Sequence, residues 1–214
     1  MNEAVFTPPT PERVTLAGPA GDLEAQWEIP SHTPSSRVAL VCHPHPLYGG
    51  SLSNKVVHMS ARALQELGMA TLKFNFRGVG RSAGTFDEGR GETDDARCAY
   101  DAIRARFPHA PVVVVGFSFG SFIAYKLTQL RAVERLILIA PPVQRFDFER
   151  SPPPSIPWSI IQGDRDDLVD HEAVLRWSTT LTPPPRVDLL SGAEHFFHGR
   201  MSDLKNSVKN ALVD

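Results

Sequence analysis

Hydrophobic residues in this chain recur in two patterns, short continuous apolar runs and longer stretches with helical spacing. The runs are typical of strands covered on both faces of a parallel sheet, and Val112-Val113-Val114-Val115 is the plainest example. The strands that these runs and their alternating neighbours predict cover residues 12–17, 23–29, 37–42, 70–76, 112–115, 133–140, 158–162 and 186–190.

Helical spacing falls between most of these strands. The helices that it predicts cover residues 55–67, 92–106, 119–130, 171–180 and 201–213. Gly68 is placed to end the first helix in a left-handed conformation, and Asp170 to cap the helix that begins at residue 171. Strands that alternate with helices predict an α/β fold, with a mostly parallel sheet and helices on both of its faces.

The two ends of this pattern add detail to the expected architecture. Residues 18–22 contain two glycines and a proline, which suit a hairpin turn and predict an antiparallel edge at the N-terminal end of the sheet. The proline-rich and charged segment at residues 143–157 is too short to be a separate lid domain. With 214 residues, the chain is expected to form a single domain over residues 1–214.

Composition excludes several classes of partner. The formal net charge of −2 offers no long-range attraction for nucleic acid or for an anionic membrane. Residues 1–9 carry an acid and prolines where a signal peptide needs a basic start, and no apolar run reaches membrane-spanning length. Cys42 and Cys98 are expected to be buried thiols in a reducing compartment, so the predicted location is the cytoplasm. The oligomeric state stays open.

The first candidate for chemistry is Ser118, at the centre of Gly116-Phe117-Ser118-Phe119-Gly120. A serine hydroxyl needs a backbone that lifts it clear of its neighbours, and a sharp turn from a strand into a helix does this. The valine run supplies the strand, residues from Phe119 onward supply the helix, and the flanking glycines remove the Cβ atoms that would collide in the turn. The context therefore predicts a nucleophile rather than a chance serine in a loop.

The chain resembles the α/β-hydrolase superfamily, and within it the small lidless hydrolases related to dienelactone hydrolase. The resemblance covers nearly the whole length. It rests on the glycine-flanked serine run and on four further segments, at residues 43–50, 74–82, 163–169 and 192–197. It implies the α/β-hydrolase fold and a catalytic triad in which nucleophile, acid and base follow one another along the chain.

The resemblance selects the acid and the base. His195 follows the last strand and matches the histidine loop of the family, with His198 as the nearby competitor. Asp166 fits the family pattern of glycine, two variable residues, aspartate, two variable residues and valine, with Asp167 as the alternative. We therefore expect Ser118 as nucleophile, His195 as general base and Asp166 as the acid that orients the imidazole.

An oxyanion also needs hydrogen-bond donors. Phe119 begins the helix after the serine, so its backbone N–H is expected to be the first donor. The second is expected in the loop at residues 43–50, where the prolines have no N–H to give. Leu47 is favoured there, and His45 and Tyr48 stay open. His43 and His45 could suggest a metal, but two ligands do not make a site, and no metal or other cofactor is expected.

These residues predict a serine hydrolase that cleaves small carboxylic esters through an acyl-enzyme. Without a lid the site should be open, which favours short acyl groups. Aromatic residues that could line the site are Tyr48, Phe117, Phe119, Phe196 and Phe197. A thioesterase, lactonase, peptidase or acyltransferase could use the same triad, and a binding protein on this scaffold is the alternative from another class.

Overall fold

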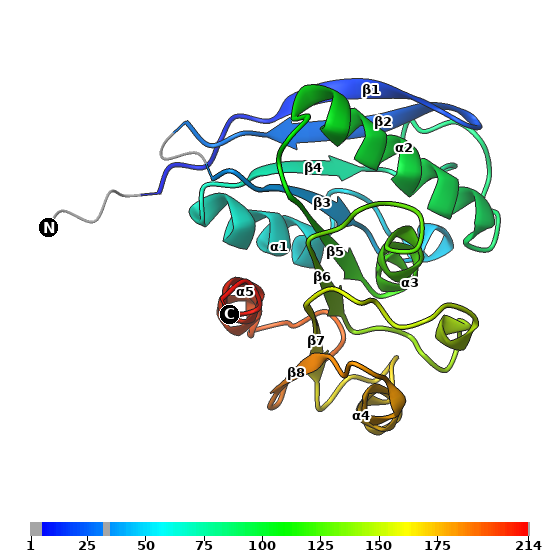
Figure 1. Ribbon diagram of the computed structural model, residues 1–214, viewed down its shortest axis with the longest axis vertical. Coiled ribbons are helices and arrows are strands. Elements are labelled where there is room, and N and C mark those ends of the chain that lie inside the picture. Colours follow the sequence, from blue (N-terminus) through cyan, green and yellow to red (C-terminus); the bar gives the residue numbers. More distant parts are fainter. Residues whose placement is uncertain (1–5, 32–34, 214) are drawn as a thin grey trace, which may run out of the picture.

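The protein is built around an eight-stranded sheet, seen in a computed structural model that describes residues 6–31 and 35–213 (Figure 1). The strands are β1 (Glu12–Gly18), β2 (Gly21–Glu28), β3 (Val38–Cys42), β4 (Ala70–Phe74), β5 (Val112–Phe117), β6 (Arg135–Ile139), β7 (Trp158–Gly163) and β8 (Arg186–Leu190). Residues 1–5, the start of the segment that was compared with a signal peptide and does not match one, lie outside the described residues. So do residues 32–34 and 214.

Five α-helices and two short 3-10 helices connect the strands within the described ranges. The α-helices are α1 (Lys55–Glu66), α2 (Arg90–Arg106), α3 (Phe119–Leu127), α4 (His171–Thr180) and α5 (Met201–Asn210). The 3-10 helices are η1 (Pro46–Tyr48) and η2 (Phe148–Arg150), which the hydrophobic pattern does not predict. Every predicted strand and helix is present, which confirms the α/β fold.

The strand order is β1-β2-β4-β3-β5-β6-β7-β8. Strands β4, β3, β5, β6, β7 and β8 are all parallel to one another, whereas β2 pairs antiparallel with both β1 and β4. The antiparallel N-terminal edge is therefore confirmed. Because the central strands share one direction, the loops that follow them gather at one edge of the sheet, where α/β proteins place their sites.

The apolar runs are buried because both faces of the sheet are covered. Helices α1 and α5 pack on one face, and α2, α3 and α4 lie on the other (Figure 1). Neighbouring residues of one strand enter different layers: Val114 packs in the layer of α2 and α3, and Val113 and Val115 pack in the layer of α1 and α5. A strand with two covered faces needs apolar side chains on both, which explains the continuous runs.

Some elements are shorter than the sequence pattern predicts. Strand β4 ends at Phe74, because the Asn75 side chain and the Phe76 N–H turn to partners outside the sheet. Helix α3 ends at Leu127 and continues only as turns. Gly68 has a φ of 81° and ends α1, and the Asp170 carboxylate accepts the Glu172 N–H at the start of α4, so both helix-end predictions are confirmed.

The helices and the two cysteines bear on the features from which the compartment was predicted. None of the helices within the described ranges is both long enough and apolar enough to cross a membrane. Cys42 and Cys98 are both free thiols, and Cys42 is buried as predicted. Cys98 is only half-buried, which corrects the prediction. It lies where α2 meets the edge strand β1, with its Sγ beside the Ala17 carbonyl, and an edge strand leaves its neighbours partly open to solvent.

A buried ion pair holds the long loop after β4 against α2. Asp95 of α2 has a fully buried side chain and accepts hydrogen bonds from the Arg77 backbone N–H, Nε and Nη2 at 3.0, 3.0 and 2.7 Å. These bonds raise the pKa of the Arg77 guanidinium. A second bidentate pair on the same helix joins Arg131 to Asp101, whose side chain is 53% exposed.

These two pairs predict different costs for the same substitution. Asp95→Ala leaves a nearly buried guanidinium and a backbone N–H without partners, so it should lower the free energy of unfolding by about 3 kcal/mol. Asp101→Ala removes a pair that water already screens, so it should cost less than about 1 kcal/mol. Urea unfolding of the wild type and both variants measures the difference, and equal costs would contradict it.

Candidate active site

Ser118 lies in a sharp turn between β5 and α3, with φ 54° and ψ −120°. This backbone conformation is strained for a residue with a side chain, at a cost of about 1–3 kcal/mol. The Ser118 N–H donates to the Ile139 carbonyl at 2.8 Å, and the Ser121 hydroxyl donates to the carbonyls of Gly116 and Ile139. These bonds tie the turn to β6, so the surrounding structure maintains the strained backbone.

The two glycines of this turn are required by close backbone contacts. A Cβ at Gly116 would lie 2.2 Å from the Gly120 carbonyl oxygen, and one at Gly120 would lie 2.4 Å from the Cys42 carbonyl oxygen. Neither backbone atom can move without shifting a strand or a helix. The glycines predicted to relieve collisions therefore do so, and Gly120 also lets α3 start directly against the end of β3.

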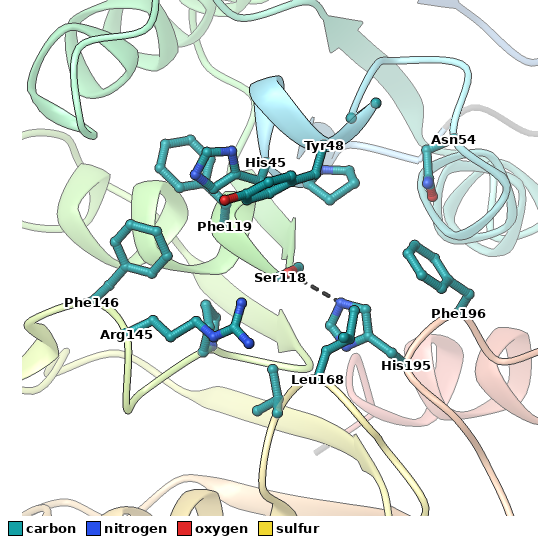
Figure 2. A pocket seen from close by; sticks show the side chains of 15 residues that line it. His45, Tyr48, Asn54, Ser118, Phe119, Arg145, Phe146, Leu168, His195 and Phe196 are labelled. Carbon is teal, nitrogen blue, oxygen red and sulfur yellow. Dashed lines mark hydrogen bonds between the residues drawn. The ribbon is translucent and has the colours of Figure 1, made fainter.

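The structure brings Ser118, His195 and Asp166 together from three separate loops. His195 Nε2 lies 3.2 Å from Ser118 Oγ, and His195 Nδ1 lies 2.8 Å from Asp166 Oδ2 (Figure 2). The His195 side chain is 3% exposed and the Asp166 side chain is completely buried. Both ring nitrogens of one histidine thus face the two partners that proton transfer from a serine requires.

The carboxylate of Asp166 is held by its own loop. Its Oδ1 accepts the backbone N–H groups of Leu168 and Val169 at 2.9 and 2.8 Å, and its Oδ2 also accepts from the Gln162 amide at 3.1 Å. Hydrogen bonds from several donors fix the direction in which a carboxylate points.

The competing residues of the same loops lie elsewhere. His198 is 65% exposed and sits 3.8 Å from Glu194, and Asp167 is exposed at the surface. Asp164 accepts the Gly192 N–H at 2.6 Å and so links the acid loop to the histidine loop. Of the candidates left by the sequence, the geometry favours His195 and Asp166.

His43 is a structural part of the loop after β3. It is fully buried, its Nδ1 donates to the Pro44 carbonyl at 2.6 Å, and its Nε2 accepts the Phe76 N–H at 3.0 Å. Burial lowers the pKa of His43 to about 3, so the ring is neutral and fits this pair of bonds. In the part of the chain that the structure describes, no three His, Cys, Asp or Glu side chains gather as a metal site would require.

The backbone N–H groups near Ser118 differ in their availability. Phe119 is the first residue of α3, so its N–H has no acceptor within the helix. The Leu47 N–H donates to the His45 imidazole at 3.2 Å, and the Tyr48 N–H donates to the His45 carbonyl at 3.1 Å. The His45 N–H has no hydrogen-bond acceptor among residues 6–31 and 35–213. The turn of η1 thus occupies the backbone N–H of Leu47, the favoured second donor, and leaves the backbone N–H of His45 free to donate.

Ser118 and His195 open into a cavity of about 640 Å³ (Figure 2). Its walls are mostly apolar and come from loops that are far apart in the sequence. The lining residues are Pro44, His45, Tyr48, Gly49, Gly50, Asn54, Ser118, Phe119, Pro142, Arg145, Phe146, Leu168, Val169, His195 and Phe196.

The aromatic lining is only partly the predicted one. Tyr48, Phe119 and Phe196 line the cavity. Phe117 and Phe197 do not, because their side chains are buried in the layer that packs against α1 and α5. Arg145 and Phe146 also line the cavity, although the sequence does not predict them because their segment shows no chemical motif. Its proline-rich position directly after a central strand was the available signal.

Comparison with known proteins gives matches along the whole chain. Residues 48–151 match the family model described as serine aminopeptidase, S33. An uncharacterized protein of Rickettsia prowazekii is 36% identical over 94% of this chain and 88% of its own length.

Solved structures with similar folds include two bacterial proteins. A serine hydrolase without a lid from Xanthomonas campestris is 40% identical, has a TM-score of 0.91 and aligns over 98% of this chain and 96% of its own. A serine hydrolase homologue from Coxiella burnetii is 38% identical, with a TM-score of 0.92 over 97% of this chain and 100% of its own. With the strand order and the turn at Ser118, these matches show that the chain belongs to the α/β-hydrolase superfamily, among its lidless serine hydrolases.

Proposed function

We propose that this protein is a serine esterase that hydrolyses small carboxylic esters, with Ser118, His195 and Asp166 as its catalytic triad. The observation that carries the proposal is the continuous chain of contacts, 3.2 Å from Ser118 to His195 and 2.8 Å from His195 to Asp166. A buried carboxylate on one ring nitrogen and a serine hydroxyl on the other is the arrangement that makes a hydroxyl nucleophilic at neutral pH.

In the first step Ser118 Oγ attacks the ester carbonyl while His195 Nε2 takes the hydroxyl proton. Asp166 accepts the Nδ1–H of His195, which keeps the proton off Nε2 beforehand and stabilises the imidazolium that forms. The imidazolium then protonates the departing alcohol. An acyl group remains on Ser118.

In the second step water takes the place of the alcohol. His195 removes a proton from the water, the resulting hydroxide attacks the acyl group, and Ser118 regains its proton from His195 as the acid leaves. The cavity opens directly to solvent between Tyr48, Leu168 and Phe196, so water has a route to the acyl-enzyme.

The oxyanion of both steps needs two donors. We assign the backbone N–H of Phe119, the first residue of α3, and the backbone N–H of His45, a residue of the loop after β3 that lines the same cavity. His45 replaces Leu47 in this role because the Leu47 N–H already donates to the His45 ring. The His43 bond to the Pro44 carbonyl fixes the peptide just before His45.

The cavity supports a small substrate. Its volume of about 640 Å³ lies within the range of ordinary small-molecule sites. None of the described residues forms a lid over it, so a long acyl chain would extend along exposed side chains such as Leu168 rather than into a closed tunnel. We therefore propose short acyl groups as the preferred class.

The nucleophile is tested by covalent labelling. A fluorophosphonate probe should label the wild type at one site, and Ser118→Ala should abolish labelling because no other serine is expected to be activated by a histidine. Ser121 lies three residues after Ser118 and its hydroxyl donates to backbone carbonyls, so Ser121→Ala should still be labelled. Intact-mass spectrometry gives the readout, and an unlabelled folded wild type would argue for a binding protein instead.

The acid is tested by a matched pair of substitutions. Asp166→Asn should lower kcat by about 10⁴-fold, since the amide cannot stabilise the imidazolium and favours the wrong tautomer. Asp167→Asn changes an exposed side chain in the same loop and should leave kcat near the wild-type value. Steady-state hydrolysis of para-nitrophenyl acetate compares them, and the reverse order would move the acid to Asp167.

The second oxyanion donor can be removed without altering the local backbone. His45 has a φ of −56°, which proline adopts, so His45→Pro deletes the N–H at a compatible position. It should lower kcat by about 10²- to 10³-fold. His45→Ala removes the same imidazole but keeps the N–H, and it should retain most activity. Equal losses in the two variants would assign the effect to the side chain rather than to the donor.

A further inference from the structure

Arg145 is the one Lys, Arg, Asp or Glu among the described residues that line the cavity. It lies on the connection between β6 and β7, far in sequence from the three triad residues. Figure 2 shows its side chain extending from this loop with the guanidinium turned toward the part of the cavity that holds Ser118. A permanent cation thus shares a small, mostly apolar space with the proposed nucleophile.

The guanidinium has no protein partner in the part of the chain that the structure describes. The nearest carboxylate along the chain, Asp147, pairs with Arg150 at 2.6 Å. Glu88, which shares a neighbouring hollow with Arg145, lies 3.8 Å from Arg90. Arg77, by contrast, is largely buried and pairs with Asp95, whereas Arg145 is exposed. Arg145 keeps its donors free for a bound molecule.

The backbone and the neighbouring aromatic ring of this loop fix the position of Arg145. The backbone N–H groups of Arg145 and Phe146 both donate to the Pro142 carbonyl, at 3.0 and 3.2 Å. The Phe146 ring stacks on Phe122 at 5.0 Å between centroids and meets Phe119 edge-on at 5.3 Å. The position from which Arg145 reaches the cavity is therefore anchored to α3, the helix that starts after Ser118.

Arg145 supplies a positive charge to the cavity, and the residues that line the cavity with it determine how a ligand meets that charge. The neighbouring His45 has its pKa lowered by burial and by the Arg145 charge, so it is neutral at pH 7 and supplies no second positive charge. Pro142, Phe146 and Leu168, which line the same cavity, have apolar side chains, and Arg145 itself is exposed to solvent. A guanidinium offers forked donors that match a carboxylate or a phosphate, and an exposed guanidinium can be reached by a ligand that enters the cavity from solvent.

We propose that Arg145 selects substrates in which the ester also carries an anionic group, a carboxylate or a phosphate. The inference deepens the proposed esterase function and rests on it: the ester carbonyl binds at Ser118 while the anion binds at Arg145 across the same cavity. Arg145 acts as a specificity-determining residue that touches substrate away from the reacting atoms.

The test compares esters that differ only in the charge at the far end of the acyl chain. The probes are the mono-para-nitrophenyl ester of adipic acid, its ω-phosphonate counterpart and the neutral para-nitrophenyl hexanoate. The wild type should show a higher kcat/KM for the anionic esters. Arg145→Gln should lower the ratio of anionic to neutral kcat/KM by about 10- to 100-fold, mainly through KM, because a charge-assisted contact is lost.

Two further variants complete the comparison. Arg150→Gln lies on the same loop outside this cavity and should leave the ratio at its wild-type value. Arg145→Lys keeps the charge but loses the fork, so it should recover part of the preference. Loss confined to the adipate ester would identify a carboxylate as the preferred group, and loss confined to the phosphonate a phosphate. A ratio that Arg145→Gln does not change overturns the proposal.

A binding measurement separates this proposal from the esterase assignment. Ser118→Ala and Ser118→Ala/Arg145→Gln are titrated calorimetrically with the adipate ester and with the hexanoate. Tighter binding of the anion to the first variant alone supports Arg145 even if the wild type hydrolyses no ester. Equal binding of both esters to both variants refutes it, even if the wild type is an active esterase.

Discussion

The close contact between the start of α3 and the end of β3 is the constraint on which the site depends. Gly120 sits so near the Cys42 carbonyl that no side chain fits between them, and Gly116 is pressed as closely against Gly120. This proximity forces Ser118 into its strained conformation and raises its hydroxyl at the edge of the sheet. It also brings the loop at His45 close to Phe119, so one backbone contact positions both the proposed nucleophile and the proposed oxyanion site.

The parallel sheet then supplies the remaining groups without long-range adjustment. The acid loop follows β7 and the histidine loop follows β8, two neighbouring strands that end at the same edge as β5. Polar links between loops fix their spacing: Asp164 accepts the Gly192 N–H, and neutral His43 joins the loop after β3 to the chain after β4. These contacts use backbone partners, so they position the loops whatever side chains line the cavity.

The site combines buried and open parts. The Asp166 side chain and nearly all of His195 are covered, which keeps their contact out of bulk water and strengthens it. The mouth, by contrast, exposes Tyr48 and Leu168 to solvent, because the connection between β6 and β7 is short and does not cover them. That connection carries Arg145 to the cavity wall. The side chains of His195 and Asp166 are thus covered by protein, whereas a substrate would meet exposed side chains at the mouth of the cavity.

The sequence by itself determined the fold and the proposed nucleophile, because apolar periodicity reports burial on each face of the sheet and the glycines around Ser118 report a steric need. Family resemblance added His195 and Asp166, although the residues alone left His198 and Asp167 open. Only the tertiary structure decided which N–H groups near Ser118 are free, since the η1 turn engages Leu47, and which aromatic rings face the cavity. It alone revealed Arg145, because the meeting of loops that are distant in sequence depends on strand order and packing, which no local pattern records.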